Sequence, residues 1–282
     1  MPGILYIVAT PIGNLDDMPP RVAATFGAAD FVAAEDTRVT LKLLNHLGLK
    51  KPMMSYYEHA LHHGAAILDR IEAGESCALC SDAGMPCISD PGEQIVKDAI
   101  ARGITVTPVP GASACVTALA VSGQDTARFV FEGFLPVPKK ERRERLEFLQ
   151  GETRTVIFYE APHKLRGTLD DLCAAFGAER SITLCRELTK RYEEAYQSTF
   201  AEALQRFETE EPKGECVIVI EGRSIEDLKR EQQKSWEEMS LEDHMEVYLA
   251  QGIDRKEAMK KVAKDRGISK RDVYQGLMER EG

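Results

Sequence analysis

Residues 78–100 read ALCSDAGMPCISDPGEQIVKDAI and contain a change from a strand pattern to a helix pattern. The first three residues form a short apolar run that is typical of a buried strand, and small and acidic residues follow at 81–84. Apolar residues recur at helical spacing from Ile95 to Ile100. We expect this helix to begin near Asp90 as its N-cap, with Pro91 in its first turn.

The loop between this strand and this helix is a candidate binding site. In an open α/β sheet, ligands lie at the carboxyl ends of the strands, where small residues let a ligand approach the backbone. Asp82 is the first charged side chain after the strand. An ordinary surface turn with a helix cap would have a similar sequence, so this loop alone does not decide between the two interpretations.

Strand and helix patterns alternate on both sides of this loop. Apolar strands, most of them followed by helical patterns, are expected at 4–8, 31–34, 78–80 and 105–109. This alternation predicts a parallel sheet with helices on its faces. A second α/β domain is predicted by strand patterns at 129–131, 155–160, 182–186 and 216–220. Short helices follow, and the predicted domains are 1–112, 113–223 and 224–282.

The composition limits the class of protein. With 282 residues the chain is long enough for two domains that each bury a core. The seven cysteines lie mostly in apolar runs, which fits free thiols in a reducing compartment. No apolar run approaches the roughly 18 residues of a membrane span, and Ile4–Val8 is interpreted as a strand rather than as part of a signal peptide. We expect a cytoplasmic protein without a membrane partner.

Common cofactor and metal motifs are missing from the sequence. Neither the three-glycine dinucleotide fingerprint nor the Gly-Lys-Ser/Thr phosphate loop is present, so a pyrophosphate cradle is not expected. His59 and His63 have the spacing of two metal ligands on a helix, but a third ligand is not evident. No metal is expected. His59 is interpreted as a polar loop residue that faces the expected ligand-binding cleft.

Residues 35–38, Glu-Asp-Thr-Arg, follow the predicted strand at 31–34. Two acids, a hydroxyl and a guanidinium at the carboxyl end of a strand form a candidate catalytic group. The alternative is a helix cap with a local ion pair, although a cap would use only one of the two acids.

Positive charge is concentrated in two parts of a chain whose formal net charge is −10. Residues 252–282 contain nine Lys/Arg and six Asp/Glu, and residues 258–274 resemble a helix-turn-helix with a cap at Ser269. Candidate contacts to RNA phosphates are Lys139, Lys140, Arg142, Arg143, Lys260, Lys264, Lys270 and Arg271. The alternatives are a solvated helix face for the first group and a helical bundle that docks a dimer for the second.

Several phrases occur in the order seen in the tetrapyrrole methylase superfamily. They are ATPIGNL (9–15), AEDTR (34–38), SDAGMPCISDPG (81–92), VPGAS (109–113), FYE (158–160) and RELTK (186–190). The longest phrases resemble the ribosomal RNA branch of the superfamily, which 2′-O-methylates a cytidine of 16S rRNA in the small ribosomal subunit. The resemblance covers about residues 1–222.

The resemblance implies a fold, a cofactor and an oligomeric state. It implies two α/β domains with a cleft between them that binds S-adenosylmethionine (SAM), and a homodimer. By position in the motifs, the implied SAM contacts are Pro11, Asp82, Gly84, Met85, Ser113, Ala114, Tyr159, Glu160 and Leu188.

The implied reaction needs a group that activates the acceptor. A ribose hydroxyl is a poor nucleophile while it is protonated, so we expect a base or polarising group in the cleft. The candidates at strand ends are Glu35, Asp36 and His59, with Arg38 placed to hold a phosphate or to orient an acid. The competing functions are methylation of a small molecule or a modified protein residue by the same fold, and a non-catalytic RNA-binding assembly factor.

Overall fold

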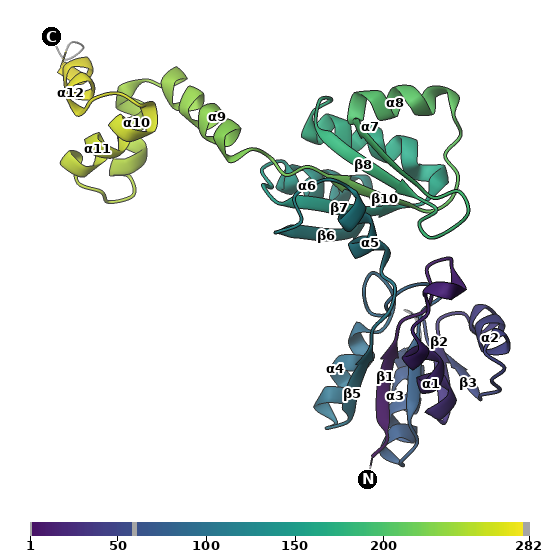
Figure 1. Cartoon of the computed structure of the whole chain (residues 1–282). Coiled ribbons are helices and arrows are strands. Elements are labelled where there is room, and N and C mark those ends of the chain that lie inside the picture. Colours follow the sequence, from purple (N-terminus) through teal and green to yellow (C-terminus); the bar gives the residue numbers. More distant parts are fainter. Residues whose placement is uncertain (1, 58–60, 279–282) are drawn as a thin grey trace. The chain divides into compact units, whose positions relative to one another are not determined.

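The computed structural model describes residues 2–57 and 61–278 (Figure 1). The chain forms two compact units. The first, Met1–Phe148 with Arg154–Glu221, contains both β-sheets, and the second, Leu149–Thr153 with Gly222–Gly282, contains the C-terminal helices. Within the described residues, no helix is both long and apolar enough to cross a bilayer.

The first sheet is parallel and has the strand order β3-β2-β4-β1-β5. Its strands are β1 (Ile4–Val8), β2 (Phe31–Ala34), β3 (Met53–Ser55), β4 (Cys77–Cys80) and β5 (Thr105–Val109). Proline has no N–H to donate to a neighbouring strand, and Pro108 is tolerated because β5 is an edge strand. The predicted parallel sheet is confirmed.

Helices cover both faces of this sheet. The connecting elements are η1 (Leu15–Asp17), α1 (Pro20–Ala28), α2 (Thr37–His46), α3 (Leu61–Glu72) and α4 (Glu93–Ala101). Successive strand residues point to opposite faces. Leu79 therefore packs in the cluster that includes residues of α3 and α4, and Ala78 packs in the cluster that includes residues of α1 and α2. With both faces covered, the polar side chains gather in the loops at the strand ends.

Helix α4 begins later than the sequence predicts. Its N-cap is Gly92, not Asp90, and Pro91 precedes the helix. The loop continues through left-handed conformations at Cys87 (φ 69°) and Ser89 (φ 66°) before the helix starts. Asp90 does not cap the helix, and its carboxyl lies beside Ser81.

The second sheet is mixed and has the order β6-β7-β10-β8-β9. Its strands are β6 (Phe129–Phe134), β7 (Thr155–Glu160), β8 (Ser181–Arg186), β9 (Glu194–Thr199) and β10 (Cys216–Ile220). Strand β6 runs parallel to β7, and the other neighbours are antiparallel. The predicted strands are present, and β9 is an edge strand that the sequence pattern did not indicate.

Helices also pack on this second sheet. They are α5 (Ala114–Val121), α6 (Lys139–Leu149), α7 (Leu165–Phe176) and α8 (Phe200–Thr209), with the short η2 (Pro162–Lys164) before α7. Helix α5 packs Ala118 and Leu119 against Ile157 and Val219. Figure 1 shows α7 and α8 side by side, and the rings of Phe176 and Phe200 stack between them at 6.5 Å. Helix α5 thus starts at the end of the first sheet and packs on the second.

The second unit consists of α9 (Ile225–Glu238), α10 (Leu241–Leu249), α11 (Arg255–Arg266) and α12 (Lys270–Met278). Its core includes Met245, Val262 and Val273. Gly267 ends α11 in a left-handed conformation, and the Asp272 N–H donates to the Ser269 hydroxyl (3.1 Å). The expected glycine turn and serine cap are therefore present. The domain limits 1–112, 113–223 and 224–282 stay a prediction, because one compact unit contains both sheets.

Candidate active site

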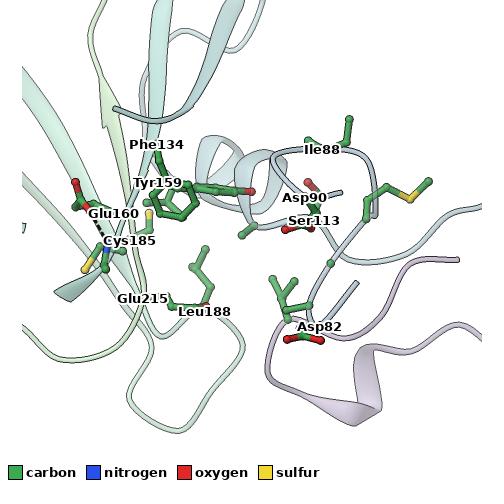
Figure 2. A pocket seen from close by; sticks show the side chains of 18 of the residues that line it. Asp82, Ile88, Asp90, Ser113, Phe134, Tyr159, Glu160, Cys185, Leu188 and Glu215 are labelled. Carbon is green, nitrogen blue, oxygen red and sulfur yellow. Dashed lines mark hydrogen bonds between the residues drawn. The ribbon is translucent and has the colours of Figure 1, made fainter. Parts of the chain in front are cut away.

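One cavity of about 280 Å³ lies at the strand ends of both sheets in the first unit (Figure 2). Its size is near the lower end of the range for small-molecule sites, roughly 300–1,000 Å³. The lining residues follow β1, β2, β4 and β5 in the first sheet, and lie at the ends of β6, β7, β8 and β10 in the second. This is the position at which open α/β sheets bind ligands.

The structure brings together eight of the nine residues that the family resemblance assigns to SAM. These residues come from separate segments of the chain and line the same cavity: Asp82, Gly84, Met85, Ser113, Ala114, Tyr159, Glu160 and Leu188. Pro11 is not among the lining residues, whereas its neighbour Ile12 is. That these residues bind SAM stays a prediction.

A short antiparallel bridge holds the loop after β1 against the loop after β4. The Thr10 N–H donates to the Gly84 carbonyl (2.8 Å), the Gly84 N–H donates to the Thr10 carbonyl (3.1 Å), and the Thr10 hydroxyl donates to the Ser81 carbonyl (3.2 Å). Gly84 has φ +81°, and a Cβ there would lie 3.3 Å from Cγ2 of Ile12. The bridge therefore sets Ile12, rather than Pro11, beside the cavity, and it needs a glycine at position 84.

Three carboxyl groups from the first sheet line the cavity: Glu35, Asp82 and Asp90. Burial is the largest cause that raises the pKa of each, and the nearby negative charges raise them further. The Asp82 N–H donates to Oε2 of Glu35 (3.5 Å), and Oδ1 of Asp82 accepts from the Asp36 N–H (3.1 Å). Such carboxyls accept a proton more readily than exposed ones, and their ionised forms can stabilise a cation.

Asp36 and Arg38 stabilise the start of α2. Asp36 is the N-cap and accepts from the Arg38 N–H (2.8 Å), and the Arg38 guanidinium pairs with the same carboxylate (2.6 Å). The hydrogen bond from the Arg38 side chain is the main cause that lowers the pKa of Asp36 to about 2. Neither residue lines the cavity. The alternative of a cap with an ion pair therefore describes these two residues, and His59 lies outside the described residues.

The second sheet contributes aromatic and apolar side chains, among them Phe134, Tyr159 and Leu188 (Figure 2). The ring of Tyr159 meets that of Phe134 edge to face at 5.8 Å. Its hydroxyl accepts a hydrogen bond from the Cys115 N–H (2.9 Å), and burial raises the pKa of Tyr159 to about 12. Tyr159 thus ties β7 to the first turn of α5. Ser113, the N-cap of α5, makes no side-chain capping bond.

The carboxylate of Glu160 is used by the fold. It is 5% exposed and accepts from the Ala161 N–H (2.8 Å) and the Thr168 hydroxyl (2.6 Å). Arg142 donates to the same Thr168 hydroxyl (2.8 Å) and pairs with Asp171 (2.6 Å). Arg142 is therefore largely buried and paired within the fold, unlike the other candidate contacts on α6, and its contact to RNA stays a prediction.

The other candidate RNA contacts lie on the surface of their own units. Lys139, Lys140 and Arg143 are exposed on α6. In the second unit, Lys260, Lys264 and Arg271 are exposed and Lys270 is half-exposed. Their contact to RNA stays a prediction.

Several cavity residues were missed in the sequence. Glu187 and Lys190 flank Leu188 in the quoted RELTK phrase, so the phrase itself was a usable signal. Asp90 was interpreted only as a helix cap. Three more residues likewise lie within the quoted phrases ATPIGNL and SDAGMPCISDPG: Ile12, Ala83 and Ile88. The remaining residues that were missed lie within strands or loops without a distinguishing pattern: Phe134, Ala161, Cys185, Glu215, Cys216 and Val217.

Comparison with known proteins identifies the family. Residues 4–204 match the family model described as Tetrapyrrole (Corrin/Porphyrin) Methylases. The chain is 48% identical over 273 residues to the Ribosomal RNA small subunit methyltransferase I of Halalkalibacterium halodurans, covering 96% of this chain and 93% of that protein. It is 44% identical over 280 residues to the protein of the same name from Synechocystis sp., covering 99% of each.

Solved structures show the same fold. The crystal structure of the methyltransferase CobJ superposes with a TM-score of 0.60 at 16% identity, covering 79% of this chain and 97% of that chain. The fold predicted from the sequence is thereby confirmed. The chain belongs to the tetrapyrrole (corrin/porphyrin) methylase family, whose members take their methyl group from S-adenosylmethionine.

Proposed function

We propose that the chain transfers the methyl group of SAM to the ribose 2′-oxygen of a cytidine in 16S rRNA of the small ribosomal subunit. Methyl transfer from SAM is the chemistry of the family. The near full-length similarity to two rRNA small subunit methyltransferases supports rRNA as the acceptor. The observation that carries the proposal is the convergence of eight predicted residues from distant segments on one cavity.

The charge of the cavity fits the methyl donor. Of the residues that the structure describes, six carboxylate residues and one lysine line it: Glu35, Asp82, Asp90, Glu160, Glu187, Glu215 and Lys190. SAM supplies a methyl group that is already activated by a positively charged sulfur. Carboxylates around a partly buried cavity stabilise such a cation. Gly84 adds to the fit, because its missing side chain lets a ligand approach the backbone.

Glu35 is the proposed general base. Its carboxylate lines the cavity, and burial together with Asp82 and Asp90 raises its pKa, so it accepts a proton more readily than an exposed glutamate. The Asp82 N–H orients Oε2 of Glu35. In the proposed reaction, Glu35 takes the proton of the ribose 2′-hydroxyl while the oxygen bonds to the methyl carbon. The bond between that carbon and the donor sulfur breaks, and S-adenosylhomocysteine leaves as the neutral thioether.

The apolar wall of the cavity has a second part in this proposal. Phe134, Tyr159 and Leu188 give the cavity an apolar side, and Tyr159 fixes the turn that carries Ser113 and Ala114. Aligning the nucleophile, the methyl carbon and the sulfur is the main contribution that a protein makes to such a transfer.

The C-terminal helices are proposed to bind the RNA. Helices α11 and α12 contain eight Lys/Arg and three Asp/Glu. The similarity to CobJ covers 79% of this chain, whereas the similarity to the two rRNA methyltransferases covers 96–99% of it. The similarity to the rRNA methyltransferases therefore includes most of these helices. We also propose that the chain is a homodimer in the cytoplasm. All seven cysteines are free thiols, in keeping with a reducing compartment.

The test is incubation of the purified chain with tritiated SAM and small ribosomal subunits that lack the modification. We expect label in 16S rRNA, in a dinucleotide that resists alkaline cleavage because its 2′-oxygen is methylated. Subunits that already carry the modification are the matched control and should take up no label. Label in a base, in protein or in a small molecule, or no label at all, would contradict the proposal.

A further inference from the structure

We infer that Lys190 binds a backbone phosphate of the RNA beside the nucleotide to be methylated, and so positions the ribose over the cavity. This inference rests on the proposed function and names a substrate-positioning residue for it. Three observations support the inference: Lys190 lines the cavity, the fold leaves space for its side chain, and its loop has an unusual backbone conformation.

Among the described residues that line the cavity, Lys190 is the single cation. The carboxylates there suit the positively charged methyl donor but repel the phosphates that accompany any RNA ribose. A polyanion can bring its sugar to such a cavity only where a cation offsets that repulsion. The side chain of Lys190 is a third exposed, so a ligand can reach part of it.

The fold leaves room for the Lys190 side chain at a glycine. A Cβ on Gly13 would lie 2.6 Å from Cγ and 2.7 Å from Cε of Lys190, so any other residue there would displace the lysine. The stem of Lys190 therefore lies across the loop after β1, although the residue itself belongs to the loop after β8. This contact holds the ammonium between loops from both sheets.

A second glycine makes room for the partner of Lys190. The ammonium of Lys190 pairs with Oε1 of Glu187 (3.0 Å), and a Cβ on Gly214 would collide with that carboxylate. An ammonium has three N–H donors. One donor is used by Glu187, which orients the lysine and leaves donors for a phosphate oxygen.

The loop after β8 has two residues with an unusual backbone conformation, and this conformation helps to place Lys190 at the cavity. Glu187 (φ 49°) and Thr189 (φ 67°) are in the left-handed region, although neither is a glycine. Such conformations cost energy and persist where the surrounding structure requires them, often at functional sites. The Lys190 N–H closes the turn on the Glu187 carbonyl (2.9 Å). The turn places Leu188 and Lys190 on the cavity together.

The experiment compares the full-length chain with Lys190→Met, Lys190→Arg and Gly13→Ala. Lys97→Met, on α4 and outside the cavity lining, removes the same charge elsewhere and is the matched control. For each protein we would measure the KM for small ribosomal subunits, the dissociation constant of SAM by calorimetry, and the salt dependence of subunit binding. Circular dichroism would check that each variant is folded.

We expect Lys190→Met to raise the KM for subunits about tenfold or more. The slope of the logarithm of subunit affinity against the logarithm of salt concentration should become less steep by about the amount that one phosphate contact contributes. SAM affinity should change less than twofold. Lys190→Arg should retain most of the activity, Gly13→Ala should behave like Lys190→Met, and Lys97→Met should match the unaltered chain.

Two results would overturn the inference while leaving the proposed function intact. In the first, Lys190→Met methylates subunits with an unchanged KM. In the second, it loses SAM affinity as strongly as subunit affinity, which would assign Lys190 to the carboxylate of the donor. Failure of the unaltered chain to methylate subunits would instead overturn the proposed function, and the assignment of Lys190 with it.

Discussion

The cavity of the first unit and helices α11 and α12 of the second carry opposite charges. Six carboxylates and one ammonium line the cavity, whereas the two helices contain eight basic and three acidic residues. The cavity carboxyls of Glu35, Asp82 and Asp90 are partly buried and have raised pKa values. Most of the lysines and arginines of the helices lie in water.

This difference matches the two substrates of the proposed reaction. The methyl donor is a cation that must be enclosed, and the methyl acceptor is part of a polyanion that is too large to enclose. A single chain can serve both with a partly buried acidic cavity in one unit and an exposed basic surface on the other. Changes to the cavity carboxylates should then affect methyl transfer, and changes to the basic helices should affect subunit binding.

The largest effect is expected from Glu35→Gln. If Glu35 is the base, turnover at saturating SAM and saturating subunits should fall about 10²- to 10⁴-fold, the usual contribution of general base catalysis. The matched control is Asp36→Asn, next in sequence but outside the cavity. It should weaken the cap of α2 and leave turnover within about twofold. Equal turnover in both variants would remove Glu35 from the mechanism.

The second effect concerns the basic helices. Replacing Lys260, Lys264, Lys270 and Arg271 together by alanine should raise the KM for subunits about 100-fold at physiological salt and should make binding less sensitive to salt. SAM affinity should be unchanged, because the cavity lies in the other unit. A fourfold alanine variant with an unaltered KM would mean that these helices dock another copy of the chain rather than RNA.

A smaller effect is expected from Tyr159→Phe. The change leaves the Cys115 N–H without its hydrogen-bond acceptor, which costs about 1–3 kcal/mol for a buried donor. The turn that carries Ser113 and Ala114 should loosen, and SAM should bind up to about tenfold more weakly. Tyr192→Phe, at a tyrosine that is 74% exposed, is the matched control. Equal SAM affinity in the two variants would show that this hydrogen bond does not shape the cavity.

The smallest effect is on stability. A carboxyl whose pKa is raised by folding favours its neutral form in the folded state, so the ionised Glu35 destabilises the chain at neutral pH. Glu35→Gln should therefore raise the Tm of the ligand-free chain by roughly 1–3 °C at pH 7. The gain should shrink as the pH falls through the raised pKa of Glu35, and it should disappear below roughly pH 3.5, where the carboxyl is protonated in both states. A gain that persists there would need another cause.

The sequence predicted the parallel sheet because buried strands with helices between them have a strong apolar pattern. It did not indicate β9, since that edge strand is mostly polar and its residues are not buried. It also placed the start of α4 at Asp90. The proline there is a common signal for a first turn, but the loop continues in left-handed conformations to Gly92.

The residues that line the candidate site were predicted better than the chemical role of each residue. The resemblance of short phrases to a known family was enough to choose eight lining residues, because those phrases lie in the loops that the fold brings together. Sequence position could not distinguish Glu35, which lines the cavity, from Asp36, which caps a helix one residue later. That distinction depends on the direction of each side chain, and so does the position of Lys190 over Gly13.

The most direct test of the central claim is a crystal structure of the chain with S-adenosylhomocysteine, the product that remains after methyl transfer. We predict that its sulfur lies in the cavity between the first-sheet carboxylates and Leu188, in contact with residues 82–85 and 113–114. Binding of the nucleoside elsewhere on the chain, or a cavity closed by its own side chains, would contradict the account.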